Sequence, residues 1–181
     1  MKLTDNEIIM LMSQSQTSEK GLRGMMDAYQ SRLYWHIRRL IVQHDLAQDV
    51  LQDTFIKAFQ NFAQFKNDSQ LYTWLYRIAT NEAITFINQK AKRRGISTDE
   101  LQNSYTSQLK ADTHFDGDEA QIKLQKAIAL LLQKQQLVFK MKYFEEIKYE
   151  DMSEILQTSV GALKASYHHA VKKIEEYMNN N

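Results

Sequence analysis

The 181-residue sequence contains no cysteine, no proline and only five glycines. The absence of cysteine excludes disulfide bonds, cysteine-containing zinc sites and a thiol nucleophile, and it suits a reducing compartment. Because proline and glycine interrupt helices, their scarcity favours helices over a turn-rich sheet. The formal net charge is only +1. Any nucleic-acid surface must therefore come from local clusters of charge.

Long apolar runs are also missing. No window approaches the roughly 18 apolar residues that a bilayer-spanning helix needs. Acidic residues interrupt the short apolar run near the start of the chain, which makes it a poor secretory signal. With 43% hydrophobic and 25% charged residues, the composition is that of a soluble globular chain. We therefore expect a cytoplasmic protein with no membrane insertion.

Catalytic and metal-binding patterns are absent as well. The five histidines include no pair at a metal-ligand spacing beside a carboxylate base. The sequence has neither a glycine-rich phosphate loop nor a Gly-x-Ser-x-Gly nucleophile turn. Because catalysis needs a convergent set of reactive side chains, we expect no enzyme activity, no metal and no cofactor.

What the sequence does contain is helical periodicity. After a short first helix that Thr4 or Asp5 can cap, apolar residues recur at three- and four-residue steps over about 22–43, over about 46–62 and from about 70 to Arg94. The periodicity fades over 95–120, an acidic stretch that we interpret as a flexible, partly disordered linker. It returns over 121–181. The sequence thus predicts an all-α fold of two small helical domains, 1–94 and 121–181, joined by that linker.

The first domain centres on the stretch from Asp45 to Arg94. Its third helix has an apolar face for the core, made of Val50, Leu51, Phe55, Ala58, Phe59 and Phe62. Among the outward residues, Asp49 and Asp53 lie one turn apart with Gln52 beside them. The two carboxylates either compensate the helix dipole or bind a partner, and composition alone favours the dipole.

The next helix carries aromatic and basic side chains. A loop over 65–69 precedes it, and Asp68 or Ser69 can cap it. Trp74 falls on the apolar face and should pack in the core. Tyr72 and Tyr76 lie one turn apart, either as rings that stack on bases or as amphipathic residues at the core margin. The helix ends in four cations that are either solvated or neutralise phosphates, namely Lys90, Lys92, Arg93 and Arg94.

The last helices have helix-turn-helix spacing. Units over about 149–156 and 159–177 are separated by Gln157-Thr158, and Ser159 is a good N-cap for the second unit. The outward side of that second unit would carry Gly161, Lys164, Ala165, His168 and Lys172. In a helix-turn-helix protein this face enters the major groove, although any three-helix bundle with short turns can produce the same spacing.

Together these residues resemble a known family. Asp49, Gln52, Asp53 and Phe55 form an Asp-x-x-Gln-Asp-x-Phe run, and the segment 72–79 reads Tyr-Thr-Trp-Leu-Tyr-Arg-Ile-Ala, followed by Asn81. Both runs are similar to signatures of bacterial sigma factors of the extracytoplasmic-function group. The final helices resemble the domain that reads the −35 promoter element. The resemblance covers nearly the whole chain.

The resemblance implies a function and partners. Such a protein binds core RNA polymerase, directs promoter-specific initiation, and holds promoter DNA in its double-stranded and melted forms. Asp49, Gln52 and Asp53 would dock on the clamp helices of the largest polymerase subunit through charge-assisted hydrogen bonds. The acidic linker would pass through the polymerase towards the RNA exit path. An anti-sigma factor is a further candidate partner.

The DNA contacts that the resemblance implies fall into two groups. The loop 66–71 would form a pocket for a flipped base of the −10 element, with Asn81 beside it, so that capture also stabilises melting. The full −10 set is Lys66, Asn67, Asp68, Ser69, Tyr72, Tyr76, Arg77, Asn81, Lys90, Lys92, Arg93 and Arg94. The −35 set is Ser159, Gly161, Lys164, Ala165, His168, His169 and Lys172.

The second domain departs from the family pattern. Leu132-Gln133 replaces the usual Leu-Pro, the segment 161–166 reads Gly-Ala-Leu-Lys-Ala-Ser where the family has Gly-Thr-Val-Lys-Ser-Arg, and Val171 stands in place of an arginine. Fewer cations imply weaker phosphate anchoring at the −35 element.

Two other functions explain less of the sequence. A helix-turn-helix regulator that acts without core polymerase accounts for residues 121–178, but it leaves the acid pair and the Tyr72–Asn81 signature unused. A helical protein-interaction module gives the chain no DNA role.

Overall fold

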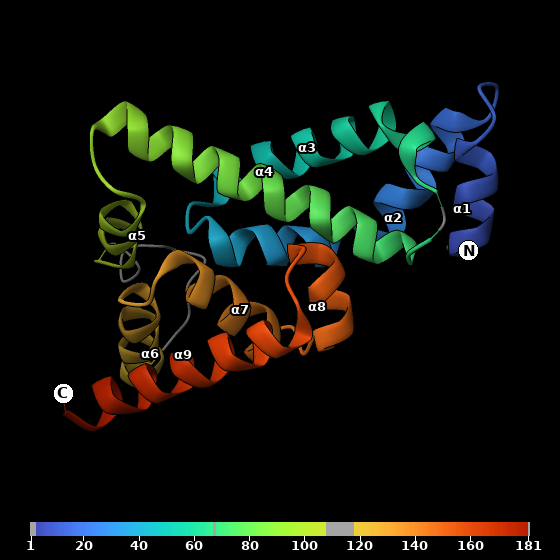
Figure 1. Ribbon diagram of the computed structural model, residues 1–181. Helices are drawn as coiled ribbons and strands as arrows, with labels where there is room; N and C mark the ends of the chain where they lie inside the picture. The colour runs from blue at the N-terminus through green and yellow to red at the C-terminus, as the bar shows by residue number, and fades with distance from the viewer. Residues whose placement is uncertain (1–2, 67, 108–117, 181) are drawn as a thin grey trace.

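The computed structural model of the protein describes residues 3–66, 68–107 and 118–180 (Figure 1). Over these residues the chain is helical and contains no strand, which confirms the predicted all-α fold. The elements, in chain order, are α1 (Asp5–Met12), α2 (Ser18–Leu40), α3 (His44–Gln60), the 3-10 turn η1 (Phe62–Gln64), α4 (Leu71–Arg94), α5 (Thr98–Ser107), α6 (Glu119–Ala129), α7 (Gln133–Tyr143), α8 (Tyr149–Leu156) and α9 (Val160–Asn180).

Side-chain caps start two helices where the sequence predicts them. The Thr4 hydroxyl accepts a hydrogen bond from the Glu7 amide at 3.4 Å, and the Glu7 carboxylate accepts one from the Thr4 amide at 2.8 Å. This capping box satisfies two otherwise free donors at the start of α1. At α9, the Ser159 hydroxyl accepts a hydrogen bond from the Ala162 amide at 3.3 Å.

The predicted cap of α4 is wrong. The N-cap is Gln70, and no side chain caps this helix. The backbone stays extended through Gln70, with φ −65° and ψ 145°, so the helix begins too late for Asp68 or Ser69 to cap it. Both of those side chains line a cavity instead. At its other end α4 stops at Gly95, whose φ of 66° is the left-handed conformation that commonly ends helices.

Helices α1 to α4 pack around one core. α2, α3 and α4 contact each other pairwise, and α1 lies against α2. Trp74 is 6% exposed, and its ring meets those of Phe62 and Phe65 at centroid distances of 5.9 and 5.2 Å, which confirms its predicted place in the core. The assignment of Phe59 to the core face is wrong. Phe59 is 38% exposed because it points into a groove between α2 and α3.

Helices α6, α7 and α9 enclose a second, smaller core. Its buried members are Ala127, Ile128, Leu131, Phe139, Ala170 and Ile174. The Phe139 ring stacks on Tyr143 and Tyr167 at centroid distances of 5.0 and 5.8 Å. A turn at Gln157 joins α8 to α9, in the helix-turn-helix arrangement that the spacing predicts.

The predicted linker contains a helix that the sequence analysis did not foresee. α5 begins behind Ser97, whose hydroxyl accepts a hydrogen bond from the Glu100 amide at 3.1 Å, while the Glu100 carboxylate accepts one from the Ser97 amide at 2.7 Å. Leu101 anchors the helix, because its side chain is fully buried. Residues 108–117 of the predicted linker lie outside the described residues. The boundaries 1–94, 95–120 and 121–181 stay a prediction.

The two helical units, α1–α4 and α6–α9, lie against each other. Figure 1 shows α8 beside α4, and α7 also contacts α2. The side chains of Met141, Ile147, Met152 and Ile155 belong to the same buried cluster as the core of the first unit. The second unit therefore covers part of α2 and α4.

Candidate nucleic-acid interface

The predicted polymerase contact lies on the exposed side of α3. Asp49, Gln52 and Asp53 are all exposed there, and we call them the docking edge. Within the described part of the chain, neither carboxylate forms a salt bridge. Beside the edge, a groove of about 480 Å³ runs between α2 and α3 and contains Ile56 and Phe59, which are 46% and 38% exposed. The exposed side of α3 thus carries two carboxylates next to an accessible apolar strip.

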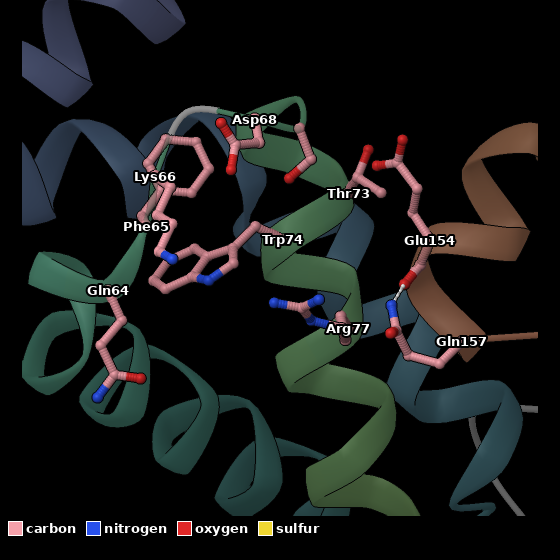
Figure 2. Close-up of a pocket in the computed structure, with 10 residues that line it drawn as sticks. Gln64, Phe65, Lys66, Asp68, Thr73, Trp74, Arg77, Glu154 and Gln157 are labelled. Atoms are coloured by element: carbon pink, nitrogen blue, oxygen red, sulfur yellow. Dashed lines mark hydrogen bonds between the residues drawn. The ribbon is translucent and has the colours of Figure 1, made fainter.

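A cavity of about 360 Å³ lies where the loop before α4 meets that helix (Figure 2). Four residues of the predicted −10 set line it, namely Lys66, Asp68 and Ser69 from the loop and Arg77 from α4. The other lining residues are Gln64, Phe65, Thr73, Trp74, Glu154 and Gln157. The predicted loop residue Asn67 lies outside the described residues. Asn81 is exposed on α4 and is not among the residues that line the cavity.

The walls of this cavity are mixed in chemistry. Trp74 supplies an aromatic surface, and Lys66 and Arg77 supply cations (Figure 2). The Thr73 hydroxyl is buried and has no hydrogen-bond partner among the described residues. Aromatic surface with a few convergent polar groups is the typical lining of a small-ligand pocket. A nucleobase, which is planar and carries donors and acceptors, fits this chemistry.

Tyr72 and Tyr76 form a cluster with Arg32 of α2. The two rings meet edge to face at 5.3 Å, and Arg32 Cζ lies 5.3 Å from the Tyr72 centroid and 5.9 Å from the Tyr76 centroid. The Tyr72 hydroxyl donates a hydrogen bond to Asp151 of α8 at 2.8 Å. Burial first, and then this hydrogen bond, raise the pKa of Tyr72 well above its ordinary value.

Tyr76 lies deeper and is only 3% exposed. Burial first, and then the negative charge of Glu145, raise the pKa of Tyr76 to about 12. Both tyrosines therefore stay protonated at neutral pH. In this arrangement Tyr76 is buried and Tyr72, held by Asp151 of the second unit, is only partly exposed.

The basic end of α4 divides into two parts. Lys92, Arg93 and Arg94 are exposed. Lys90 is only partly exposed, because its ammonium donates a hydrogen bond to the Gln43 side chain at 3.1 Å and lies 5.7 Å from the Phe86 ring. The three exposed cations are the ones positioned to neutralise phosphates.

The outer side of α9 is exposed as the sequence predicts. Its exposed residues are Gly161, Lys164, Ala165, His168, His169 and Lys172, and we call them the recognition face. Ser159, the remaining member of the −35 set, caps the helix. Leu163, Ala170 and Ile174 fix the orientation of the helix from the opposite side, where they are buried.

Sequence reasoning missed three side chains near the contact between the units. Arg32 of α2 packs on the tyrosine pair, and His36 and Glu145 form a hydrogen bond that joins positions 109 residues apart. Local periodicity carries no signal for such a contact. Among the residues that the structure describes, no group of three or more His, Cys, Asp or Glu could hold a metal ion. None of their helices is long and apolar enough to cross a bilayer.

Two sigma-factor family models match the chain. Sigma-70 region 2 matches residues 25–93, and Sigma-70, region 4 matches residues 121–174. The first match spans α2 to α4, with the docking edge and the cavity. The second begins just after the start of α6 and includes the recognition face.

Two solved structures share the fold. One is the sigma factor RpoE in complex with the anti-sigma factor NepR from Bartonella quintana, with a TM-score of 0.66 and 19% identity over 90% of this chain and 99% of that chain. The other is CnrH in complex with the cytosolic domain of CnrY, with a TM-score of 0.68 and 16% identity over 98% of each chain.

Relatives of known sequence extend the likeness to the level of the family. The chain is 30% identical to the ECF RNA polymerase sigma factor SigW of Bacillus subtilis, over 80% of this chain and 81% of the relative. It is 31% identical to the RNA polymerase sigma factor YlaC of the same organism, over 83% and 87%. It is 25% identical to the ECF RNA polymerase sigma-E factor of Haemophilus influenzae, over 96% and 95%. The chain therefore belongs to the extracytoplasmic-function group of the sigma-70 family, the sigma factors that direct RNA polymerase to promoters.

Proposed function

We propose that this sigma factor uses three surfaces, one to bind core polymerase and two to recognise the promoter. The docking edge binds core polymerase, the cavity beside α4 captures a base of the −10 element, and the recognition face contacts the −35 element. The observation that carries the proposal is the cavity, because it brings loop residues and Arg77 together around Trp74, with a Thr73 hydroxyl that has no partner among the described residues. These tasks are recognition and strand separation. We assign the chain no catalytic activity and a cytoplasmic site of action.

The docking edge has the chemistry of a contact with a basic helical partner. Two carboxylates one turn apart can accept charge-assisted hydrogen bonds from arginine or lysine, which are roughly twice as strong as neutral ones. The apolar strip at Ile56 and Phe59 adds surface that becomes buried on contact. The clamp helices of the largest polymerase subunit are the proposed partner.

The cavity couples reading to melting. A base that enters it must leave the duplex stack, which costs a few kcal/mol. Contacts with the loop and with Arg77 offset this cost only for a base that they fit, so recognition of the base stabilises the melted strand. Lys92, Arg93 and Arg94, exposed at the end of α4, would hold the adjoining backbone.

The recognition face supplies fewer cations than the family pattern. Lys164 and Lys172 are its two lysines, and His168 and His169 add ring donors. We assign this face to the major groove of the −35 element, with a shallow salt dependence because few phosphates are neutralised.

An anti-sigma factor is a further proposed partner. The solved RpoE structure of the same fold contains an anti-sigma factor. An inhibitor that holds this chain would act on the docking edge, on the DNA surfaces or on both.

Run-off transcription with purified core polymerase and a promoter library tests the proposed function. Initiation at a defined start site should occur only when this protein is added. A helix-turn-helix regulator acting on its own would give no transcript without another sigma factor, and that result would overturn the proposal.

A further inference from the structure

The junction between the two units contains a fully buried histidine. His36 of α2 is 0% exposed. Its Nδ1 lies 2.9 Å from Glu145 Oε1 in the turn after α7, and its Nε2 lies 2.8 Å from the Thr80 hydroxyl of α4. Glu145 belongs to the second unit and Thr80 to the first, so the imidazole ring joins the two units.

The hydrogen bonds around this ring fix its orientation. Nδ1 donates to the Glu145 carboxylate, because two facing lone pairs at 2.9 Å would repel each other. The Thr80 hydroxyl, which also lies 2.7 Å from the Tyr76 carbonyl oxygen, can rotate to donate to Nε2 or to accept from it. The contact between Nδ1 and the carboxylate is therefore kept whichever way that hydroxyl points.

Other charged and titratable groups lie at the same junction. Arg39 Nη1 of α2 lies 3.9 Å from the same Glu145 oxygen, so that the carboxylate has a second basic neighbour. The Tyr76 ring of α4 lies 4.8 Å from the imidazole, and its phenol stays protonated because its pKa is raised to about 12. Arg32 lies beyond Tyr76, over its ring.

The contact between the units lies over the −10 surface, by which we mean the Tyr72–Tyr76 pair and the cavity beside α4. Tyr72 donates a hydrogen bond to Asp151 of α8, and Glu154 and Gln157 form one wall of the cavity. Figure 2 shows Glu154 and Gln157 on α8 and its end, across the cavity from Lys66. While α8 lies there, Tyr76 is buried and only part of Tyr72 is exposed to a melted strand. The docking edge and the recognition face stay exposed.

We propose that the His36–Glu145 pair is a latch that holds the sigma factor in a closed form, in which the second unit covers the −10 surface of the first. What the latch covers rests on the proposed function of that surface, whereas the closed form itself does not. Loss of the hydrogen bond between His36 and Glu145 releases the second unit. The closed molecule can still meet core polymerase and −35 DNA.

Fluorescence energy transfer between the two units tests the latch. Because the chain has no cysteine, Glu19→Cys in α2 and Glu176→Cys in α9 place dyes at two exposed positions only. Glu145→Ala removes the carboxylate and leaves the core of the first unit intact. The closed-to-open ratio should then fall on the order of tenfold, as expected for a lost hydrogen bond to a charged group. Glu146→Ala, at the exposed neighbour, is the matched control and should leave the ratio unchanged.

A second variant tests the charge of the acceptor. Glu145→Gln replaces the carboxylate by a neutral amide that can still accept from Nδ1, so the closed-to-open ratio should fall by less than in Glu145→Ala. Far-UV circular dichroism checks that each variant keeps its helices.

One result would overturn the latch, namely an equal distance between the dyes in the wild type and in Glu145→Ala. If Glu145→Ala loses its helices, the comparison of Glu145→Gln with the wild type still decides. Failure of the proposed function would show separately, as absent initiation in run-off transcription.

Discussion

Asp49 and Asp53 have no counter-charge in the described part of the chain, which leaves both carboxylates available to a basic partner. Asp53→Arg should therefore weaken binding to core polymerase by at least about thirtyfold, since it removes one favourable pair and adds a repulsive one. A fluorescence titration of labelled protein with core polymerase measures the loss.

The matched control for this variant is Glu175→Arg, an exposed acid-to-base change on α9. It should bind core polymerase as the wild type does. Circular dichroism should show the same helix content for both variants, because both side chains are exposed. An unchanged affinity of Asp53→Arg would contradict the assignment of the docking edge.

Asn81 lies on α4 outside the lining of the cavity, yet its exposed amide can contact a strand that enters from that side. Asn81→Ala should reduce open-complex formation about tenfold through the lost hydrogen bonds, and it should leave core binding unchanged. Permanganate footprinting of the melted thymines measures the effect. Normal melting would remove Asn81 from the −10 set.

Lys140 of α7 is a charged residue that opposes folding. It is 8% exposed, and burial lowers its pKa to about 8. At pH 7 the folded and unfolded states both carry the charge, and the folded state bears the full cost of burying it. Lys140→Met should therefore raise the free energy of unfolding at pH 7, by up to about 3 kcal/mol for a shift of this size.

The stability that Lys140→Met gains over the wild type should shrink as the pH rises. As the pH rises from about 8 to about 10.5, the folded state releases the proton before the unfolded state does, so the wild type gains stability relative to Lys140→Met. Urea unfolding at several pH values measures the difference. Lys134→Met, on the exposed side of the same helix, should show no such dependence. A gain that stays constant up to about pH 10.5 would contradict the burial argument.

At the scale of the residue, sequence patterns predicted the helix face of a side chain better than they predicted its tertiary contacts. Trp74 is in the core because its apolar neighbours share its helix face, and that face can be seen in the sequence. Phe59 belongs to the same pattern on α3, but the neighbouring helix leaves a groove over it. Whether a facing helix reaches a given position depends on tertiary packing, which local spacing does not contain.

At the scale of the element, α7 begins without the proline that the family pattern has. Gln133 is its first residue, and Leu132 before it has φ −60° and ψ 145°, a conformation that proline allows in its predecessor. The Gln133 side-chain amide nitrogen is buried without a hydrogen-bond partner in the described structure. Gln133→Pro should raise the free energy of unfolding by about 1 kcal/mol, because proline suits the first helical position and restricts the unfolded chain.

Gln133→Ala separates the two contributions to this gain. It removes the buried amide but does not restrict the backbone, so its gain in urea unfolding should be smaller than that of Gln133→Pro. A loss of stability in Gln133→Pro would mean that the Gln133 backbone amide donates a hydrogen bond that proline cannot replace.

Helices with long apolar faces were predictable, whereas a short capped helix was not. The apolar steps in α2, α3, α4 and α9 continue over several turns, and each helix lies within a few residues of its predicted range. α5 has Leu101 as its buried anchor and is otherwise polar. The capping box of Ser97 and Glu100 was a readable signal for its start. The acidic, polar composition of 95–120 led instead to the prediction of a linker.

At the scale of the whole molecule, the sequence left open whether the two units are separate or packed together. The contacts that decide this join residues far apart in the chain, such as His36 with Glu145 and Tyr72 with Asp151. Each residue alone reads as an ordinary polar side chain. Only their placement shows that the −10 surface and the second unit compete for the same space.

This competition predicts different responses for the two halves of a promoter. The probes are a duplex with the −35 element and a single strand with the −10 element, both from a promoter selected by run-off transcription. Glu145→Ala should bind the single strand about tenfold more tightly than the wild type, because binding no longer has to displace α8. The duplex should bind both proteins equally, since the recognition face is exposed in the closed form. Fluorescence anisotropy at one fixed salt concentration measures both affinities. Equal tightening for the two probes would point to a general change in charge, and tightening for neither would mean that the −10 surface is already open.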